Sequence, residues 1–177
     1  MANAENSSVR GINRIVPVLV AVAAAALVGW LYIGGEVIET AISGKAGREA
    51  IIAAIWGHVG RGVATAPLII AYVAWRLMSD KSSFAQSAML ARAAKIALWA
   101  LCAVLVFLVV TGPIVVWTNG SDMKVFDWFV IPTFMEKAPA IHDPLESAHG
   151  IVAGITPWVV AVDFLLLVAV SLRGRSA

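Results

Sequence analysis

The chain is poor in cysteine and in charge. Cys102 is the only cysteine among 177 residues, which excludes an intrachain disulfide, a thiolate metal site and a cysteine-linked cofactor. It lies inside an apolar run, so we interpret it as a small packing residue. Only 14% of the residues are charged and the net charge is +2. This balance gives no reason to expect a nucleic-acid partner.

What the chain has instead is long apolar segments. Hydrophobic residues make up 60% of the sequence and the mean hydropathy is +0.87, far more apolar than soluble domains. Four segments approach or exceed the roughly 20 residues that cross a bilayer, namely 15–33, 50–78, 89–117 and 143–172. The sequence therefore predicts an all-α, multi-pass integral membrane protein. We expect one four-helix transmembrane bundle over residues 1–177, in contact with membrane lipid.

The connections between these segments differ in character. Residues 34–49 are expected to form a polar connection, with Gly44 and Gly47 as helix breakers. The long connection 118–141 contains an aromatic segment, 125–130, that is too short to cross a membrane. We expect this segment to lie at the membrane interface.

The distribution of basic residues predicts the orientation. Four crossings place both termini and the middle loop on one side of the membrane. That side holds Arg10, Arg14, Arg76, Lys81, Arg92, Lys95, Arg173 and Arg175. The two loops of the other side hold Lys45, Arg48, Lys124 and Lys137. The positive-inside rule therefore predicts cytoplasmic termini and an outer 118–141 loop.

Two histidines, each beside a glycine, occupy similar depths in two of the segments. His58 lies about eight residues inside helix two and His149 about six past the expected start of helix four, so at about 1.5 Å per residue their depths agree. Two facing imidazoles at one depth suit a six-coordinate haem b. Gly57 and Gly150 would leave room for a porphyrin face, and Arg61 could pair with a propionate.

A plainer interpretation keeps both histidines as hydrogen-bonded residues of a packed bundle, with the glycines allowing close helix approach. A structural zinc site is less favoured, because only His142 could add a third nitrogen. Asp143 is expected to cap helix four, with Pro144 at its first position. His142 would then be a solvated loop residue or, alternatively, a proton-transfer residue.

The chain resembles the bacterial cytochrome b561 type, four-helix haem-b electron-transfer proteins of the inner membrane. The resemblance rests on residues 57–59, 111–114, 119–120 and 144–149. It implies that His58 and His149 ligate the haem nearer the periplasm. It also implies a second haem, bound by a histidine at the start of helix one and by another fourteen residues after His149. Helix one has no histidine and the second position is Asp163, so we predict one haem per chain.

Asp163 requires a partner, because a carboxylate within a membrane segment is otherwise unfavourable. We expect an ion pair or polar cluster with Arg92 or Lys95, which enter helix three from the same side. The alternative is a proton path or a quinone-binding group. Residues 111–113, Thr-Gly-Pro, are expected to form a bend, or alternatively a quinone pocket.

Ligation by two histidines leaves no open position on iron and favours one-electron transfer. The expected function is electron transfer between a periplasmic redox partner and the quinone pool of a bacterial inner membrane, within a respiratory chain. The resemblance also implies an alternative oxidoreductase activity, the oxidation of superoxide with reduction of ubiquinone. A third possibility is a structural subunit of a larger respiratory or photosynthetic membrane complex.

Overall fold

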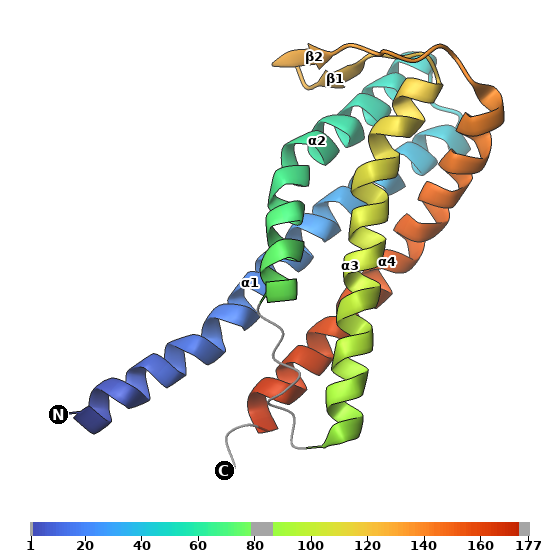
Figure 1. The fold of residues 1–177 in the computed structure, drawn as a ribbon. Coiled ribbons are helices and arrows are strands. Elements are labelled where there is room, and N and C mark those ends of the chain that lie inside the picture. The colour runs from blue at the N-terminus through green and yellow to red at the C-terminus, as the bar shows by residue number, and fades with distance from the viewer. Residues whose placement is uncertain (1, 79–86, 174–177) are drawn as a thin grey trace.

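The computed structural model describes residues 2–78 and 87–173, with side chains for 15–78 and 87–170. These residues form four long helices and one small antiparallel hairpin (Figure 1). The helices are α1 (Ala2–Ser43), α2 (Arg48–Met78), α3 (Ala88–Thr118) and α4 (Pro139–Arg173). The strands are β1 (Met123–Val125) and β2 (Phe129–Ile131), and Lys124 pairs with Val130.

Two helices match the sequence expectation closely and two are longer. α2 and α3 begin and end within two residues of the predicted bounds. α1 starts at Ala2, so Pro17 lies well inside it instead of in its first turn. α1 also continues to Ser43, because nothing between Gly34 and Ser43 forces an end. The break comes at residues 44–47, where Lys45 takes a positive φ of 54°.

The expected cap of helix four is wrong. α4 begins at Pro139, a residue whose fixed φ suits the first helical position. Asp143 is therefore an exposed residue inside the helix, and Pro144 follows it in the second turn. His142 consequently belongs to α4 and not to a loop.

The four helices pack in a ring in the order α1, α2, α3, α4, with α4 returning to α1. Among the described residues, α2 and α4 have no close backbone contact, so they occupy opposite corners of the bundle. The core joins Val28 of α1, Ile69 and Val73 of α2, and Leu101 of α3. Cys102 belongs to the same buried cluster, which confirms it as a packing residue.

Three of the helices, α1, α3 and α4, are long and apolar enough to cross a membrane. Large apolar side chains are exposed on their outer faces, among them Leu19, Trp99, Trp158 and Leu165. Such surfaces suit contact with lipid. α2 has the same length as α3, 31 residues, but it is not in this group because it carries polar residues along its length.

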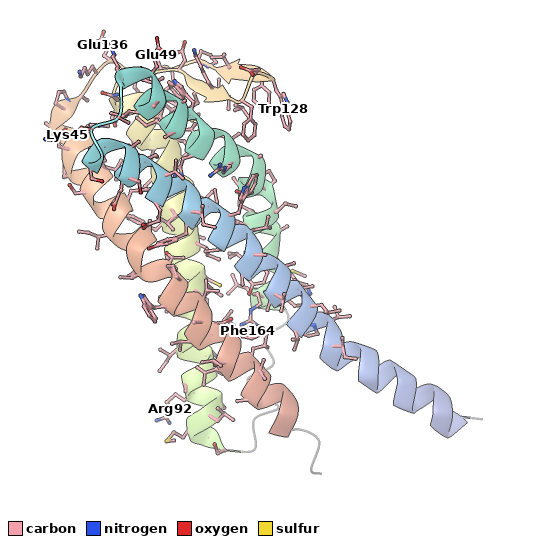
Figure 2. The ribbon with its side chains drawn as sticks, turned by 180° about the vertical axis from the view of Figure 1, so that it is seen from behind. Lys45, Glu49, Arg92, Trp128, Glu136 and Phe164 are labelled. Carbon is pink, nitrogen blue, oxygen red and sulfur yellow. The ribbon has the colours of Figure 1, made fainter. Side chains whose placement is uncertain are left out.

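The hairpin lies at one end of the bundle. Lys45, Glu49 and Glu136 lie at that same end, whereas Arg92 lies toward the other (Figure 2). Five of the basic residues that predict the orientation have no described side chain. They are Arg10 and Arg14 near the start of the chain, Lys81 in the loop 79–83, and Arg173 and Arg175 near its end. The predicted orientation of the bundle in the membrane therefore remains a prediction.

A buried ion pair connects the two opposite helices. Arg76 of α2 donates from Nη2 to both carboxylate oxygens of Asp163 on α4, at 2.7 and 2.9 Å. Both side chains are more than nine-tenths buried. The expected partners of Asp163 are wrong, because Arg92 and Lys95 are both exposed on α3. The two side chains therefore meet across the bundle, although the backbones of α2 and α4 stay apart.

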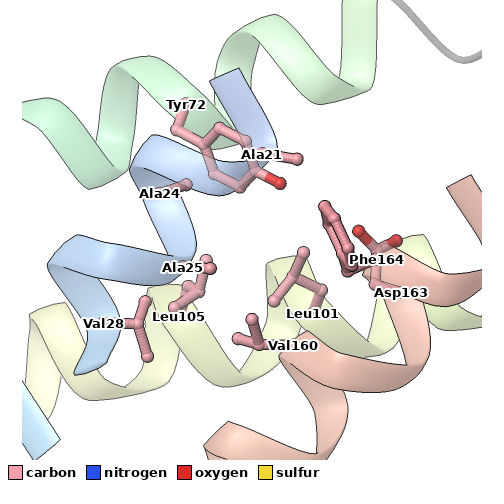
Figure 3. A pocket seen from close by; sticks show the side chains of 10 residues that line it. All are labelled: Ala21, Ala24, Ala25, Val28, Tyr72, Leu101, Leu105, Val160, Asp163 and Phe164. Carbon is pink, nitrogen blue, oxygen red and sulfur yellow. The ribbon is translucent and has the colours of Figure 1, made fainter. Parts of the chain in front are cut away.

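A narrow crevice lies beside this ion pair. Three alanines of α1, Ala21, Ala24 and Ala25, form one wall, while Tyr72 and Asp163 supply its polar atoms (Figure 3). The void inside it is only about 10 Å³, roughly the least volume that holds a single water molecule. The inner part of the bundle is therefore closely packed.

Breaking the ion pair should destabilise the protein. We expect Asp163→Leu to lower the free energy of unfolding by about 3–5 kcal/mol, because it leaves the Arg76 guanidinium buried without an anion. The double variant Arg76→Met with Asp163→Leu should lose less than the single variant, since no charge remains to be desolvated. Denaturation in detergent micelles would measure both.

Lys95→Met provides the matched control, because it removes an exposed charge that has no part in the pair. It should change stability by no more than about 0.5 kcal/mol. Equal losses in Lys95→Met and Asp163→Leu would contradict the assignment of Arg76 as the partner.

Candidate functional site

His58 projects from α2 into a niche on α1. A Cβ atom added to Gly34 would lie 3.0 Å from His58 Nδ1, and one added to Gly35 would lie 4.0 Å from Cε1. The imidazole therefore fits against α1 because Gly34 has no side chain. His58 Nδ1 is buried beside the Leu31 carbonyl without a hydrogen bond of ordinary geometry. One nitrogen of this ring is thus left unsatisfied.

Arg61 lies one turn after His58 on nearly the same face of α2. Its guanidinium packs over the indole of Trp30 on α1, with Cζ 5.5 Å from the ring centroid. A Cβ atom on Gly34 would come within 2.7 Å of Arg61 Nη1, so the same glycine admits both side chains. Among the residues whose side chains are described, no carboxylate lies within ion-pair distance of Arg61.

His149 projects from α4 toward α3. Its Nδ1 lies 2.8 Å from the hydroxyl oxygen of Thr111. A Cβ atom on Gly112 would lie 3.5 Å from His149 Cε1, an ordinary contact distance. The expected bend at residues 111–113 is part of an unbroken helix that runs to Thr118. Its threonine and glycine form the surface on which His149 rests.

The two imidazoles come from opposite corners of the ring of helices. Each ring rests against a neighbouring helix, His58 on α1 and His149 on α3, and the backbones of α2 and α4 stay apart. Across the described part of the chain, no three His, Cys, Asp or Glu residues converge on one point. The pair therefore cannot by itself form a complete site for a free metal ion.

The expected role of Gly57 and Gly150, leaving room for a porphyrin face, stays a prediction. Cβ atoms at Gly57 and Gly150 would meet nothing within 4 Å, so both positions border open space. Gly60 faces the hairpin, because its Cβ atom would lie 3.1 Å from the backbone nitrogen of Phe126. The glycine that makes room for an imidazole is Gly34, which the sequence interpretation missed.

His142 is half-buried at the hairpin end of the α3–α4 contact, which corrects its assignment as a solvated loop residue. Its Nδ1 lies 3.0 Å from the Val115 carbonyl oxygen and 3.4 Å from the Thr118 hydroxyl oxygen. Its Nε2 lies 3.6 Å from a carboxylate oxygen of the exposed Glu146. His142 therefore joins α3 to α4 and stays two turns away from His149.

The sequence carried some signal for the missed residues. The pair Gly34-Gly35 in a helix was a sign of close approach by another group, but nothing in the spacing indicated which one. The contact of Thr111 with His149 spans 38 positions and depends on how α3 and α4 are rotated about their axes.

No protein-family model, curated protein or solved structure matches the chain. The functional argument rests on the chain's own residues and their geometry.

Replacing Gly34 should disturb both polar residues of α2. We expect Gly34→Ala to displace the His58 ring and the Arg61 guanidinium and to destabilise the fold by about 1–3 kcal/mol through overpacking. Thermal unfolding in detergent would measure the loss. Gly29→Ala is the control on the same helix, because a Cβ atom there would meet nothing within 4 Å. Equal melting temperatures for the two variants would show that the niche does not constrain His58.

Proposed function

We propose that the protein is a membrane electron-transfer protein of the bacterial cytochrome b561 type, with one haem b held between His58 and His149. In this proposal it exchanges electrons between a redox partner on the outer, periplasmic side and the quinone pool of the inner membrane. The observation that carries the proposal is the pair of histidines, one on each of the opposite helices α2 and α4.

The residues present fit a haem in three ways. The two imidazoles match the two axial positions that a porphyrin leaves to the protein. His58 Nδ1 lies against the backbone of α1 beside Gly34, so Nε2 is the nitrogen left to bind iron. Arg61 is a cation one turn away with no carboxylate in ion-pair distance among the described side chains, as a propionate partner should be.

The chain's own residues would then hold and insulate the group. A bound haem supplies one-electron redox chemistry, and ligation by two histidines leaves it no open position for oxygen. His58 and His149 fix its place, and Gly34 lets His58 sit against α1. Arg61 would balance a propionate while stacked on Trp30. The apolar helices keep water from the site.

The ion pair between Arg76 and Asp163 supports one haem per chain and not two. The second site of the family would use the position of Asp163, fourteen residues after His149 and about 21 Å further along α4. There Arg76 and Asp163 bind each other directly across the bundle axis.

Charges near the hairpin end are mixed in sign. Lys45 and Lys124 are exposed in this part of the chain, but so are Glu49, Asp127 and Glu136. A strong positive field that would draw superoxide to the site is therefore not evident. This favours general electron transfer over superoxide oxidation as the proposed activity.

The proposal predicts a specific spectrum. Protein purified in mild detergent should show the reduced α band of a b-type haem, with one haem per chain by pyridine haemochrome assay. His58→Ala and His149→Ala should each abolish the six-coordinate spectrum, because iron would lose one of two axial ligands. His142→Ala is the matched control and should keep the parent spectrum.

Two results would count against the proposal. A colourless protein, even after incubation with haemin, would leave the role of a structural membrane subunit. Two haems per chain would contradict the interpretation of the Arg76–Asp163 pair as a substitute for the second site.

A further inference from the structure

Thr111 holds a position between the backbone of its own helix and the His149 ring. It is 95% buried on α3, with a relative exposure of 5%. Its hydroxyl oxygen lies 2.8 Å from the Phe107 carbonyl oxygen and 2.8 Å from His149 Nδ1. Both contacts are short enough to be full hydrogen bonds.

The count of protons decides the direction of each bond. A threonine hydroxyl has one proton to donate, and a backbone carbonyl can only accept. The Thr111 proton therefore points to Phe107 O, and the hydroxyl oxygen is left as an acceptor toward the ring. His149 Nδ1 must then be the donor. A neutral imidazole with its proton on Nδ1 carries the free lone pair on Nε2.

We propose that Thr111 is a positioning residue that sets the tautomer of His149 and thereby presents Nε2 as the metal ligand. The assignment of the Nδ1–H tautomer stands on the hydrogen-bond geometry alone, whereas its consequence for iron rests on the haem function proposed above. Histidines that bind metals usually donate the other ring N–H to a neighbouring acceptor, which fixes the ring and makes it a stronger ligand.

The neighbouring histidine of α4 shows the same arrangement. Thr118 lies seven residues after Thr111 on α3, and His142 lies seven before His149 on α4. Thr118 also donates to a carbonyl of its own helix, Ile114 O, at 2.8 Å. His142 Nδ1, at 3.0 Å from Val115 O, must likewise be the protonated nitrogen. The α3–α4 contact thus fixes the protonated nitrogen of both imidazoles, but only His149 is paired with His58 in the proposed haem site.

The two proposed ligands are therefore unequal. His149 has its Nδ1 proton bonded to a buried hydroxyl, while His58 Nδ1 has no partner of ordinary geometry. Hydrogen bonding raises the basicity of a ligating imidazole and so favours the oxidised metal. His149 should be the ligand that holds the iron more firmly.

Nitrogen-15 NMR of the protein prepared without haem tests the tautomer directly. In the parent, the His149 resonances should report a proton on Nδ1. Thr111→Val keeps the shape of the side chain but removes the acceptor, so the Nε2–H form should become populated. Thr111→Ser keeps the hydroxyl and should keep the parent tautomer. Thr156→Val is the control, because Thr156 is equally buried and its hydroxyl donates to Val152 O.

Haem titration and redox potentiometry test the consequence for iron. Thr111→Val should weaken haem binding about 10- to 100-fold, the usual effect of losing an outer-sphere partner, and should raise the midpoint potential. Thr111→Ser and Thr156→Val should match the parent in both measurements. A loss in Thr111→Val that is equalled in Thr156→Val would show a general packing effect and would overturn the proposal.

The two proposals fail in different ways. If His149 keeps its proton on Nδ1 in Thr111→Val, or carries it on Nε2 in the parent, the role of Thr111 is wrong whether or not haem binds. If the NMR result is as expected but the parent binds no haem, the electron-transfer function is wrong, and Thr111 orients His149 without presenting it to iron.

Discussion

A polar side chain inside an apolar bundle must find its partner within the protein, and this constraint shapes the whole structure. Lipid offers no hydrogen bonds, so each polar group that turns inward depends on a group from another helix. The opposite helices α2 and α4 show this twice. At one level Arg76 and Asp163 satisfy each other directly. At the other, His58 lies against α1 and His149 lies against α3, and a hydroxyl, that of Thr111, is a partner for only one of the two rings.

α1 contributes mainly by having small residues. Gly34 admits His58 and Arg61, and three alanines line the crevice beside Asp163. The polar residues of α2 can turn inward because α1 gives them room at these positions. The aromatic ring of Trp30 then covers the Arg61 guanidinium. The small residues of α1 therefore determine how the polar residues of α2 pack.

The sequence predicted where a helix begins and ends more reliably than which side of a helix faces the bundle interior. The bounds of α2 and α3 follow from counting residues along a helix of fixed rise, whereas the similar levels of His58 and His149 stay a prediction from the same count. The partner of Asp163 did not follow, because Arg76, Arg92 and Lys95 all lie toward one end of the bundle. Which of them turns inward depends on the rotation of each helix about its axis. The roles of Gly34 and Thr111 could not be predicted either, because they depend on how each helix is rotated against its neighbour.

The spacing of Arg76 and Asp163 along the chain has a consequence for biogenesis. The two residues are 87 positions apart, so at a synthesis rate of roughly 5–20 residues per second the arginine emerges about 4–17 s before its carboxylate partner. α2 is also the helix least suited to remain alone in lipid. We expect its stable placement in the membrane to wait for the synthesis of α4, which carries the carboxylate that pairs with Arg76.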